Sequence, residues 1–310
     1  MTSPVALLKH DGRKCRSKLL TVDPSSDIIE RELDMHSKAL EDKMGGDVLA
    51  FFGPILYGVE DHVRTAVEET TKKRRKLIVV LETYGGYIEV VKRIADILRH
   101  HYRRVEFVIP DNAMSAGTVL VMSGDAIHMD YYSVLGPIDP QVERPDGKMI
   151  PALGYLEKYN DLIVKSQNGT LTTAEMSFLI SKFDPAELYY YERAKELSNS
   201  LLKEWLVRFA FKNWKVTKTH RRKVTRKMKV ARAEEIANKL NDTKRWNSHG
   251  HGISMQVLRR DVNLKIEDFG EDPELDRCIR AYYKLLRDYA AKRGHRWLVH
   301  TREHYRPIGG

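Results

Sequence analysis

A serine and a pair of glycines follow two apolar runs, and these residue types could carry acyl chemistry. The run LIVVLET (77–83) leads into Gly85 and Gly86, and the run VEFVIP (105–110) leads through small residues to Ser115. Adjacent glycines allow a tight turn whose amides point at a ligand. A serine that opens a helix exposes its hydroxyl, and the next amide is free to stabilise an oxyanion. Taken singly, each feature is also typical of an ordinary turn or helix cap.

The elements around these residues are predicted to bring them together. Apolar runs at 48–55, 77–83, 105–110, 125–130 and 133–138 alternate with amphipathic helical segments, one of which opens at Ser115. Strands separated by helices need crossover connections and form a mainly parallel sheet. Because the carboxyl ends of parallel strands face one crevice, Ser115 and the Gly85–Gly86 pair are predicted to share a pocket.

The chain divides into three predicted parts. Residues 1–44 read as an N-terminal arm with one helical stretch at 27–43, and residues 45–170 as the α/β domain. Strand patterns end after Asn168, and helical patterns at 173–182, 185–212, 232–240 and 273–293 predict a helical, basic extension over 171–310. The predicted fold class is therefore α/β, a mainly parallel sheet core with a helical C-terminal extension.

Composition excludes several classes of protein. The 310 residues are 42% hydrophobic and 31% charged, which is typical of a globular chain. Cys15 and Cys278 are too few and too distant for a disulfide framework or a zinc cluster, so we expect no metal and a reducing, cytoplasmic setting. The apolar runs are also too short for a membrane helix.

Two longer motifs resemble a known family. TYGGYI, and thirty residues on AMSAGTVLVMSGDAIHMDYYSVLGPIDPQ, resemble the Clp-peptidase and signal-peptide-peptidase clan, and within it the soluble serine dehydrogenase proteinases. The likeness covers about 45–165 and continues through 232–270. It implies a ClpP/crotonase-like fold in which Ser115 attacks a peptide carbonyl. It also implies that the amides of Gly85 and Ala116, helped by Gly86, bind the oxyanion.

The general base departs from the Clp pattern. Clp peptidases carry a histidine about twenty-five residues after the serine, where this chain has Pro140 beside Asp139. Signal peptide peptidases use a lysine further along, and Lys158 stands at the shoulder of an apolar helical stripe, where partial burial would favour a neutral amine. A surface lysine is the plainer interpretation. Lys165, one heptad on, is the reserve, and Lys148 sits in a loop.

Other residues could also take part in proton transfer. His249 and His251 lie in the glycine-flanked sequence SHGHG, and an ordinary histidine titrates close enough to neutrality to serve as a base. They could equally be turn residues or act from a neighbouring subunit. Asp139 could orient a base or replace the missing histidine, or simply form a turn with Pro140. His128, inside a strand, reads as structural.

Positive charge gathers in one segment. The chain has 53 Lys and Arg against 43 Asp and Glu, a formal net charge of +10. Between Trp205 and Ala233 there are eleven Lys or Arg and no acidic residue. The basic patch that we single out consists of Arg221, Arg222, Lys223, Arg226, Lys227 and Lys229. It predicts contact with an acidic protein or with nucleic acid, although a solvated helix face has the same pattern.

These features yield three functional hypotheses. The first is a cytoplasmic serine peptidase without cofactor, acting on a peptide or protein with Ser115 as nucleophile and Lys158 slightly ahead of His249 as base. The second is an inactive Clp-like interaction module that binds an acidic partner or nucleic acid. The third is a crotonase-type acyl-transfer enzyme, because the same oxyanion geometry serves thioesters. Members of the clan form closed oligomers, so a homo-oligomer is expected.

Overall fold

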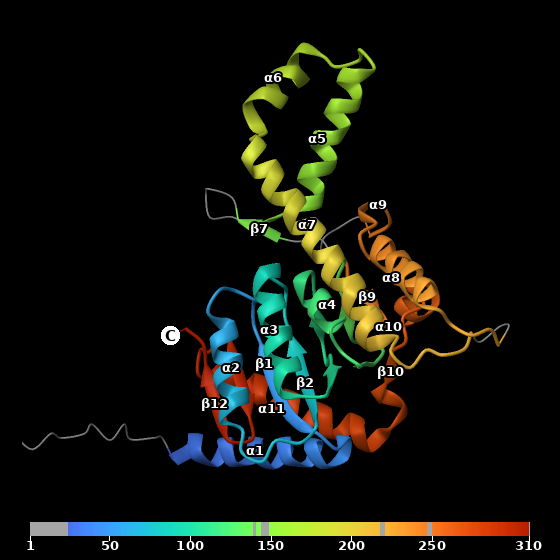
Figure 1. Ribbon diagram of the computed structural model, residues 1–310. Coiled ribbons are helices and arrows are strands. Elements are labelled where there is room, and N and C mark those ends of the chain that lie inside the picture. Colours follow the sequence, from blue (N-terminus) through green and yellow to red (C-terminus); the bar gives the residue numbers. More distant parts are fainter. Residues whose placement is uncertain (1–23, 139–140, 144–148, 218–220, 247–249, 310) are drawn as a thin grey trace, which may run out of the picture.

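A seven-stranded sheet organises the computed structural model, which describes residues 24–138, 141–143, 149–217, 221–246 and 250–309 (Figure 1). The strand order is β10-β5-β3-β2-β1-β11-β12. The strands are β1 (Asp47–Phe52), β2 (Lys76–Glu82), β3 (Arg104–Val108), β5 (Ala126–Met129), β10 (Glu267–Asp268), β11 (Leu298–Thr301) and β12 (His304–Pro307). The neighbours from β10 to β1 pair in parallel, and β11 and β12 add on antiparallel.

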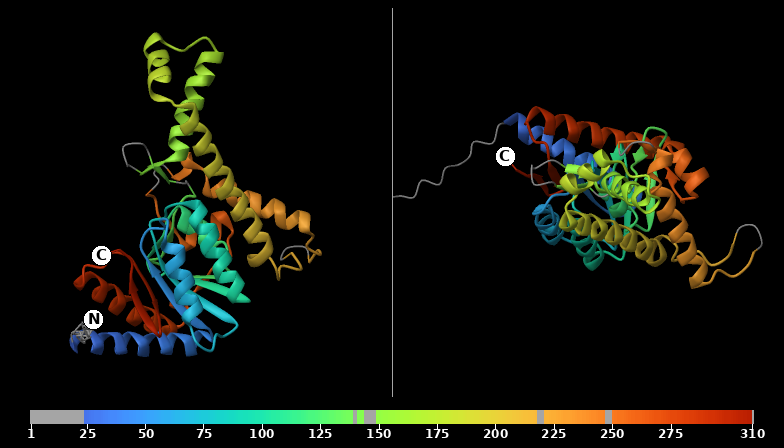
Figure 2. Two further views of the ribbon diagram at one scale, coloured as in Figure 1. Left: turned by 60° about the vertical axis from the view of Figure 1, so that its left-hand side comes forward. Right: turned by 90° about the horizontal axis from the view of Figure 1, so that it is seen from above.

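Helices cover both faces of the sheet, so its central strands carry apolar residues on both faces. On β2, Leu77, Val79 and Leu81 enter the core on the side of α2 (Val59–Glu69), α3 (Ile88–His101) and α4 (Ala116–Val121). Ile78 and Val80 enter the second core, under α1 (Pro24–Met44) and α11 (Pro273–Lys292). Figure 2 shows α1 and α11 side by side across that face.

A helical unit projects beyond the carboxyl ends of the parallel strands (Figures 1 and 2). It consists of α5 (Ala152–Gln167), α6 (Thr173–Lys182) and the outer part of α7 (Pro185–Trp205), which η1 (Leu206–Ala210) continues. Asp184 caps α7 by accepting from the amide of Ala186, with Pro185 in the first turn, as expected of a helix start. The remaining helices are α8 (Arg226–Leu240), α9 (Thr243–Trp246), α10 (Met255–Val257), η2 (Leu258–Val262) and η3 (Phe269–Glu271).

Short strands complete the elements near the predicted pocket. β4 (Asn112–Ala113), β6 (Val134–Leu135) and β9 (Ile253–Ser254) form a three-stranded sheet in that order. β7 (Gln141–Glu143) and β8 (Met149–Pro151) pair antiparallel just before α5. β4 extends the line of β3 toward Ser115, so the small sheet shapes the turn that holds this serine.

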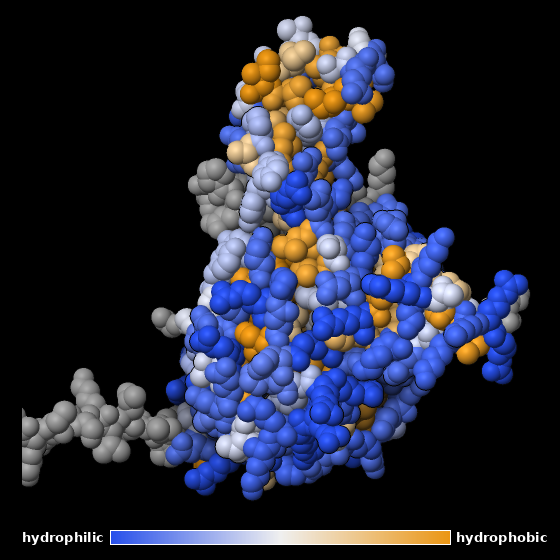
Figure 3. Space-filling model, in the orientation of Figure 1, coloured by the Kyte–Doolittle hydropathy of each residue, from blue (hydrophilic) through white to orange (hydrophobic). Residues whose placement is uncertain are grey.

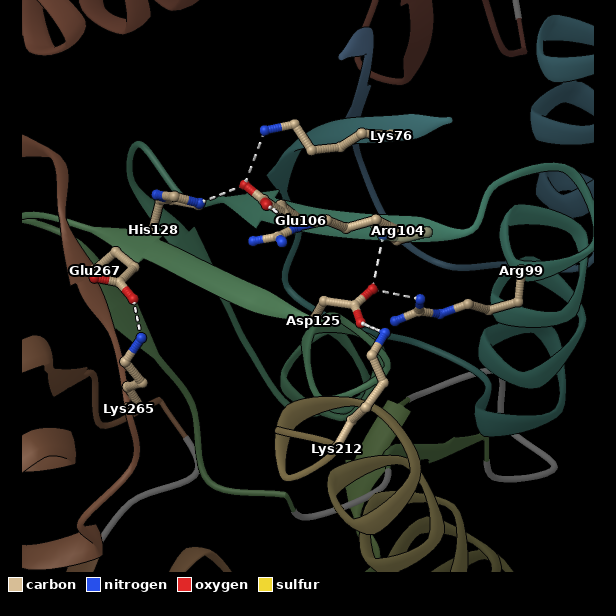
Figure 4. A network of polar contacts seen from close by, with 10 residues as sticks. Lys76, Arg99, Arg104, Glu106, Asp125, His128, Lys212, Lys265 and Glu267 are labelled. Carbon is tan, nitrogen blue, oxygen red and sulfur yellow. Dashed lines mark hydrogen bonds and ion pairs between the residues drawn. The ribbon is translucent and has the colours of Figure 1, made fainter. Parts of the chain in front are cut away.

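The inner end of the helical unit is held to the sheet by charge (Figure 4). Asp125, before β5, lies 2.6 Å from Arg99 of α3 and 3.1 Å from Lys212, which follows η1. The guanidinium of Arg99 also stacks 3.6 Å from the ring centroid of Phe209. Nearby, Glu106 of β3 pairs with His128 at 2.9 Å, which fits the structural interpretation of that histidine.

The α/β class with a mainly parallel sheet is confirmed, and two regional expectations are wrong. The stretch 1–44 was expected to be an arm, but Leu33 and Leu40 of α1 are fully buried in the second core. The stretch 171–310 was expected to be helical, but β10, β11 and β12 come from it and join the central sheet. These strands have two to four residues, too few to display the alternation that identifies a strand.

Candidate active site

Ser115 sits at a strained turn immediately before α4. Its backbone has φ 52° and ψ −119°, a left-handed φ that a residue with a Cβ rarely adopts. The residue is 1% exposed and follows β4, so the chain runs from sheet to serine to helix within four residues. Strain of this kind at a strand-to-helix turn is typical of nucleophilic serines that must present their hydroxyl.

The glycine pair forms a second turn that touches the first. Gly85 has φ +97°, and a Cβ placed on it would lie 2.9 Å from the Cβ of Ser115 and 3.1 Å from the amide nitrogen of Ala116. Gly86 has φ +149°, and a Cβ there would overlap the carbonyl of Ile55. Both positions therefore require glycine. The structure thus places Gly85 against Ser115, while Gly86 packs against Ile55.

Of the amides predicted to bind an oxyanion, two are available. The resemblance implies that the amide of Gly85 is an oxyanion donor. In the structure this amide already donates to Thr83 Oγ1 at 3.0 Å. Gly86 forms a bridge with Ile55 that uses the carbonyl of Gly85 and the amide of Tyr87. Among the described residues, no acceptor is found for the amides of Gly86 and Ala116. These two amides are therefore the remaining candidates for an oxyanion hole.

Hydrogen bonds fix the two turns relative to each other. The amide of Thr83 donates to Asn112 O at 3.1 Å, and the amide of Met114 donates to Thr83 O at 2.9 Å. On the α4 side, the hydroxyl of Thr118 lies 2.8 Å from Ala113 O and accepts from the amide of Gly136 at 3.0 Å. The sequence analysis missed Thr83 and Thr118, since threonines beside glycines are common in turns.

Among the described residues, no candidate base is seen in contact with Ser115. Lys158 was expected to be partly buried, but its side chain is exposed on α5 in the projecting unit (Figure 1). Asp139 and His249 lie outside the described residues. His251 is exposed and stacks on Trp246, with ring centroids 5.8 Å apart. Lys165 pairs with Glu175 of α6. The assignment of the base therefore stays a prediction.

A polar cluster on the opposite face of the sheet joins the strands that lead into both turns. Tyr283 of α11 lies 2.8 Å from Glu82 at the end of β2 and 3.2 Å from Asp111, four residues before Ser115. Arg287 donates to Asp111 at 3.0 Å. Burial raises the pKa of Glu82 and of Tyr283. Sequence reasoning missed Tyr283 because an aromatic residue on an amphipathic helix usually marks the core.

Arg221, Arg222 and Lys223 of the basic patch lie on a segment that projects between η1 and α8 (Figures 1 and 2), and the other three residues lie at the start of α8. Thr217 and Val224 donate backbone hydrogen bonds to Arg222 and Lys215, so residues 215–217 and 222–224 pair antiparallel as a short ribbon. Arg221, Arg222, Lys223, Arg226 and Lys227 are exposed, and none has an ion-pair partner among the described residues. Lys229 instead donates to Lys212 O at 3.2 Å.

The sheet, the strained serine and the glycine turn define a ClpP-like α/β protein. Residues 46–177 match the family model described as ClpP-like SDH-type serine proteinase. The predicted resemblance is thereby confirmed. No described helix is long and apolar enough to cross a membrane.

Individual relatives were found among curated proteins and solved structures. The uncharacterized protein MJ1495 of Methanocaldococcus jannaschii is 31% identical over 118 residues, 38% of this chain and 38% of that protein. MJ0137 of the same organism is 30% identical over 139 residues, 42% of this chain and 46% of that protein. The chain thus spans less than half the length of these curated relatives.

Two solved structures of the 1510-N membrane-bound stomatin-specific protease also match. A lysine-to-alanine mutant in complex with a substrate peptide aligns with 16% identity and a TM-score of 0.38, over 71% of this chain and 73% of that one. A serine-to-alanine mutant aligns with 18% identity and a TM-score of 0.29, over 49% of this chain and 83% of that one.

Proposed function

We propose that the protein is a serine peptidase in which Ser115 attacks the carbonyl carbon of a peptide bond. The observation that carries the proposal is the contact of the strained Ser115 turn with the Gly85–Gly86 turn. The amides of Gly86 and Ala116, which have no acceptor among the described residues, flank this contact. The match of residues 46–177 to a serine proteinase family model supports the same activity.

The reaction follows from these groups. As the Ser115 oxygen bonds to the carbonyl carbon, its proton passes to the base, and the two amides stabilise the negative charge on the carbonyl oxygen. Collapse of this intermediate breaks the C–N bond, and the base returns the proton to the leaving amine. Water, activated by the same base, then attacks the acyl group and restores the serine.

Lys158 remains our proposed base, with His249 second and Asp139 as an orienting or acidic group. An amine accepts a proton only when neutral, and desolvation favours the neutral form. Because Lys158 is exposed in a single chain, its role requires that α5 be covered. Lys158→Ala should then abolish peptidase activity, while Lys165→Ala, which alters the same helix, should retain it. Loss of activity in His249→Ala, with Lys158→Ala fully active, reverses the ranking.

A homo-oligomer would supply such a cover. Apolar side chains gather at the tip of the projecting unit, as Figure 3 shows. They include Val164, Met176, Phe178, Ile180, Tyr189 and Tyr190, each at least 41% exposed. An exposed apolar surface of this kind favours contact with another copy of the chain. Sedimentation velocity should give an oligomer that Ile180→Glu, at the most exposed of these positions, converts toward monomer.

A serine-reactive fluorophosphonate probe tests the peptidase proposal directly. Labelling of the wild type that is lost in Ser115→Ala and retained in Ser123→Ala, another buried serine, supports it. Absence of labelling in a well-folded wild type favours the inactive interaction module instead. Calorimetric binding of an acyl-CoA, with hydrolysis of the thioester and no peptide cleavage, favours the acyl-transfer alternative. The proposal also includes a cytoplasmic location, which fractionation of cells would test.

A second proposal concerns the ribbon, which we assign to nucleic-acid backbones. The exposed cations of the ribbon and of the first turn of α8 lack ion-pair partners among the described residues, and a two-stranded ribbon fits a groove of duplex nucleic acid. The test is fluorescence anisotropy with a 20-base-pair duplex. Replacing Arg221, Arg222, Lys223, Arg226 and Lys227 by Gln should abolish binding. Replacing Arg31, Arg75, Arg103, Arg277 and Arg296, five exposed cations elsewhere, should preserve it.

Salt dependence separates the possible partners of the ribbon. Binding to phosphates must weaken as salt rises, because counterions are released on binding. Affinity that is unchanged at high salt contradicts phosphate contact. Binding of polyglutamate without binding of the duplex assigns the ribbon to an acidic protein instead.

A further inference from the structure

One tyrosine of α11 bridges the two strand ends that lead into the candidate site. The oxygen of Tyr283 lies 2.8 Å from Glu82 Oε2 and 3.2 Å from Asp111 Oδ2. Nη1 of Arg287 donates to that oxygen at 2.8 Å and to Asp111 Oδ2 at 3.0 Å. Because Arg287 occupies an acceptor site of the phenol, the single phenolic proton is directed toward the carboxyl groups.

The two carboxyl groups stand close in sequence to the reacting turns. Glu82 precedes Gly85 by three residues, and Asp111 precedes Ser115 by four. Between these points the strand ends are joined by one backbone bridge, Thr83 to Ala113. The Tyr283 bridge lies just before it, on the face covered by α11. The side chain of Tyr283 therefore links the two segments whose spacing sets the oxyanion hole.

Packing and neighbouring hydrogen bonds hold Tyr283 in place. The ring of Tyr283 is 6% exposed and meets Phe52 of β1 edge to face, with centroids 5.5 Å apart. One turn earlier on the same helix face, Arg280 donates to Pro110 O at 2.7 Å and pairs with Asp130. Since burial raises the pKa of Tyr283, its hydroxyl keeps its proton as a donor at neutral pH.

We propose that Tyr283, supported by Arg287, is a positioning residue that holds the oxyanion turn at its working distance from Ser115. The proposal rests on the proposed peptidase function. It also gives a role in the site to α11, which lies outside the segment matched by the family model. Placement matters at this scale, since a misplacement of about 1 Å can cost about a hundredfold in rate.

The test compares two tyrosines of one helix. Tyr283→Phe keeps the ring against Phe52 and removes the hydroxyl. Tyr289→Phe is the control. It removes an equivalent hydrogen bond, from the Tyr289 hydroxyl to Glu30 Oε1 at 2.8 Å, which is remote from both turns. In Tyr283→Phe, kcat for peptide hydrolysis and the rate constant of fluorophosphonate labelling should fall about tenfold or more, with KM changed little. In Tyr289→Phe both should stay near wild type. A Glu82→Gln variant, whose amide oxygen still accepts from Tyr283, should retain most of the rate.

A second measurement does not depend on activity. Amide hydrogen exchange at 83–86 and 111–116 should speed up in Tyr283→Phe and stay at the wild-type rate in Tyr289→Phe. Unchanged exchange at these segments, or equal rates of labelling in Tyr283→Phe and wild type, overturns the positioning role. An unlabelled wild type instead overturns the peptidase proposal, and the exchange data then decide whether Tyr283 orders the turns.

Discussion

Gly85 packs directly against Ser115, because a Cβ on Gly85 would lie 2.9 Å from the Cβ of Ser115. The two residues belong to turns thirty positions apart in the chain, and each has a positive φ. The contact is tight enough that neither turn can move without the other. The geometry of the candidate site is thus set by backbone packing, and the variants below separate packing from chemistry.

Gly85→Ala should abolish activity. The new methyl group would meet Met114 O and Ser115 Cβ at 2.9 Å and displace the nucleophile, so labelling of Ser115 should fall about a hundredfold. Gly294→Ala is the control, since Gly294 also has a left-handed φ, +71°, with open space around it. Both variants should lose about 1 kcal/mol or more of unfolding free energy, measured in urea. Full labelling of Gly85→Ala would contradict the tight contact.

Replacing the strained serine should reveal what its backbone conformation costs. At φ 52° a glycine is far less strained than an alanine. Ser115→Gly should therefore be more stable than Ser115→Ala by about 1 kcal/mol, although both lack the nucleophile. Urea unfolding monitored by circular dichroism measures the difference. Equal stabilities would show that the backbone at this position relaxes once the serine is replaced.

Asp125→Asn should loosen the helical unit from the sheet. The change removes a charge between Arg99 and Lys212, and it leaves the guanidinium of Arg99 largely buried without its carboxylate. The loss of unfolding free energy should be about 2 to 4 kcal/mol. The control, Asp96→Asn, breaks an exposed pair with Lys92 and should cost under about 0.5 kcal/mol. A comparable loss in both variants argues against the anchoring role.

Stability should depend on pH through His300, which is 1% exposed. Burial lowers the pKa of His300 to about 3, from an ordinary value of 6.5. As pH falls below 6.5 the unfolded chain binds a proton that the folded chain excludes, so this contribution to stability is lost between pH 6.5 and 3. His300→Gln, whose amide can still form a hydrogen bond with the hydroxyl of Tyr282, lacks this contribution.

The measurement is the unfolding free energy in urea at several pH values. The slope against pH between 4 and 6 should be steeper in wild type than in His300→Gln, by up to about 1.4 kcal/mol per pH unit. Asp34 titrates in the same range, because burial raises its pKa to about 6, and its contribution to stability falls as pH rises. Asp34 Oδ1 also lies 3.9 Å from His300 Nε2, so both proteins are compared in an Asp34→Asn background. Parallel slopes would contradict a neutral buried histidine.

The meeting of Ser115 with Gly85 could be predicted from the sequence because each of the two turns follows a long apolar strand. Ser115 and Gly85 stand at equivalent points of neighbouring crossover units, and the parallel sheet brings such points together. The engagement of the Gly85 amide by Thr83 was not predictable, since a threonine two residues before a glycine also occurs in turns that lack this bond. It leaves the amides of Gly86 and Ala116 as our proposed oxyanion donors.

The other features of the site and the fold could not be predicted, because they depend on contacts between residues far apart in the sequence. Tyr283 is some 170 residues from Asp111 and 200 from Glu82, and a helical pattern carries no information about which strand ends it covers. Glu267 and Asp268 of β10 are polar and only two residues long, so no periodicity marked them as a strand. Lys158 was placed on an apolar shoulder by helical geometry, but α5 projects away from the sheet that would have buried it.

The order of the strands also bears on how the chain folds during synthesis. The segment that matches the family model contributes the four inner strands, and residues after 260 supply β10 on one side and β11 with β12 on the other. A nascent chain that has emerged only to residue 177 therefore presents two open sheet edges, which pair readily with strands from other chains. Until translation reaches these strands, the unfinished chain is a candidate for chaperone capture or for exchange of strands between copies.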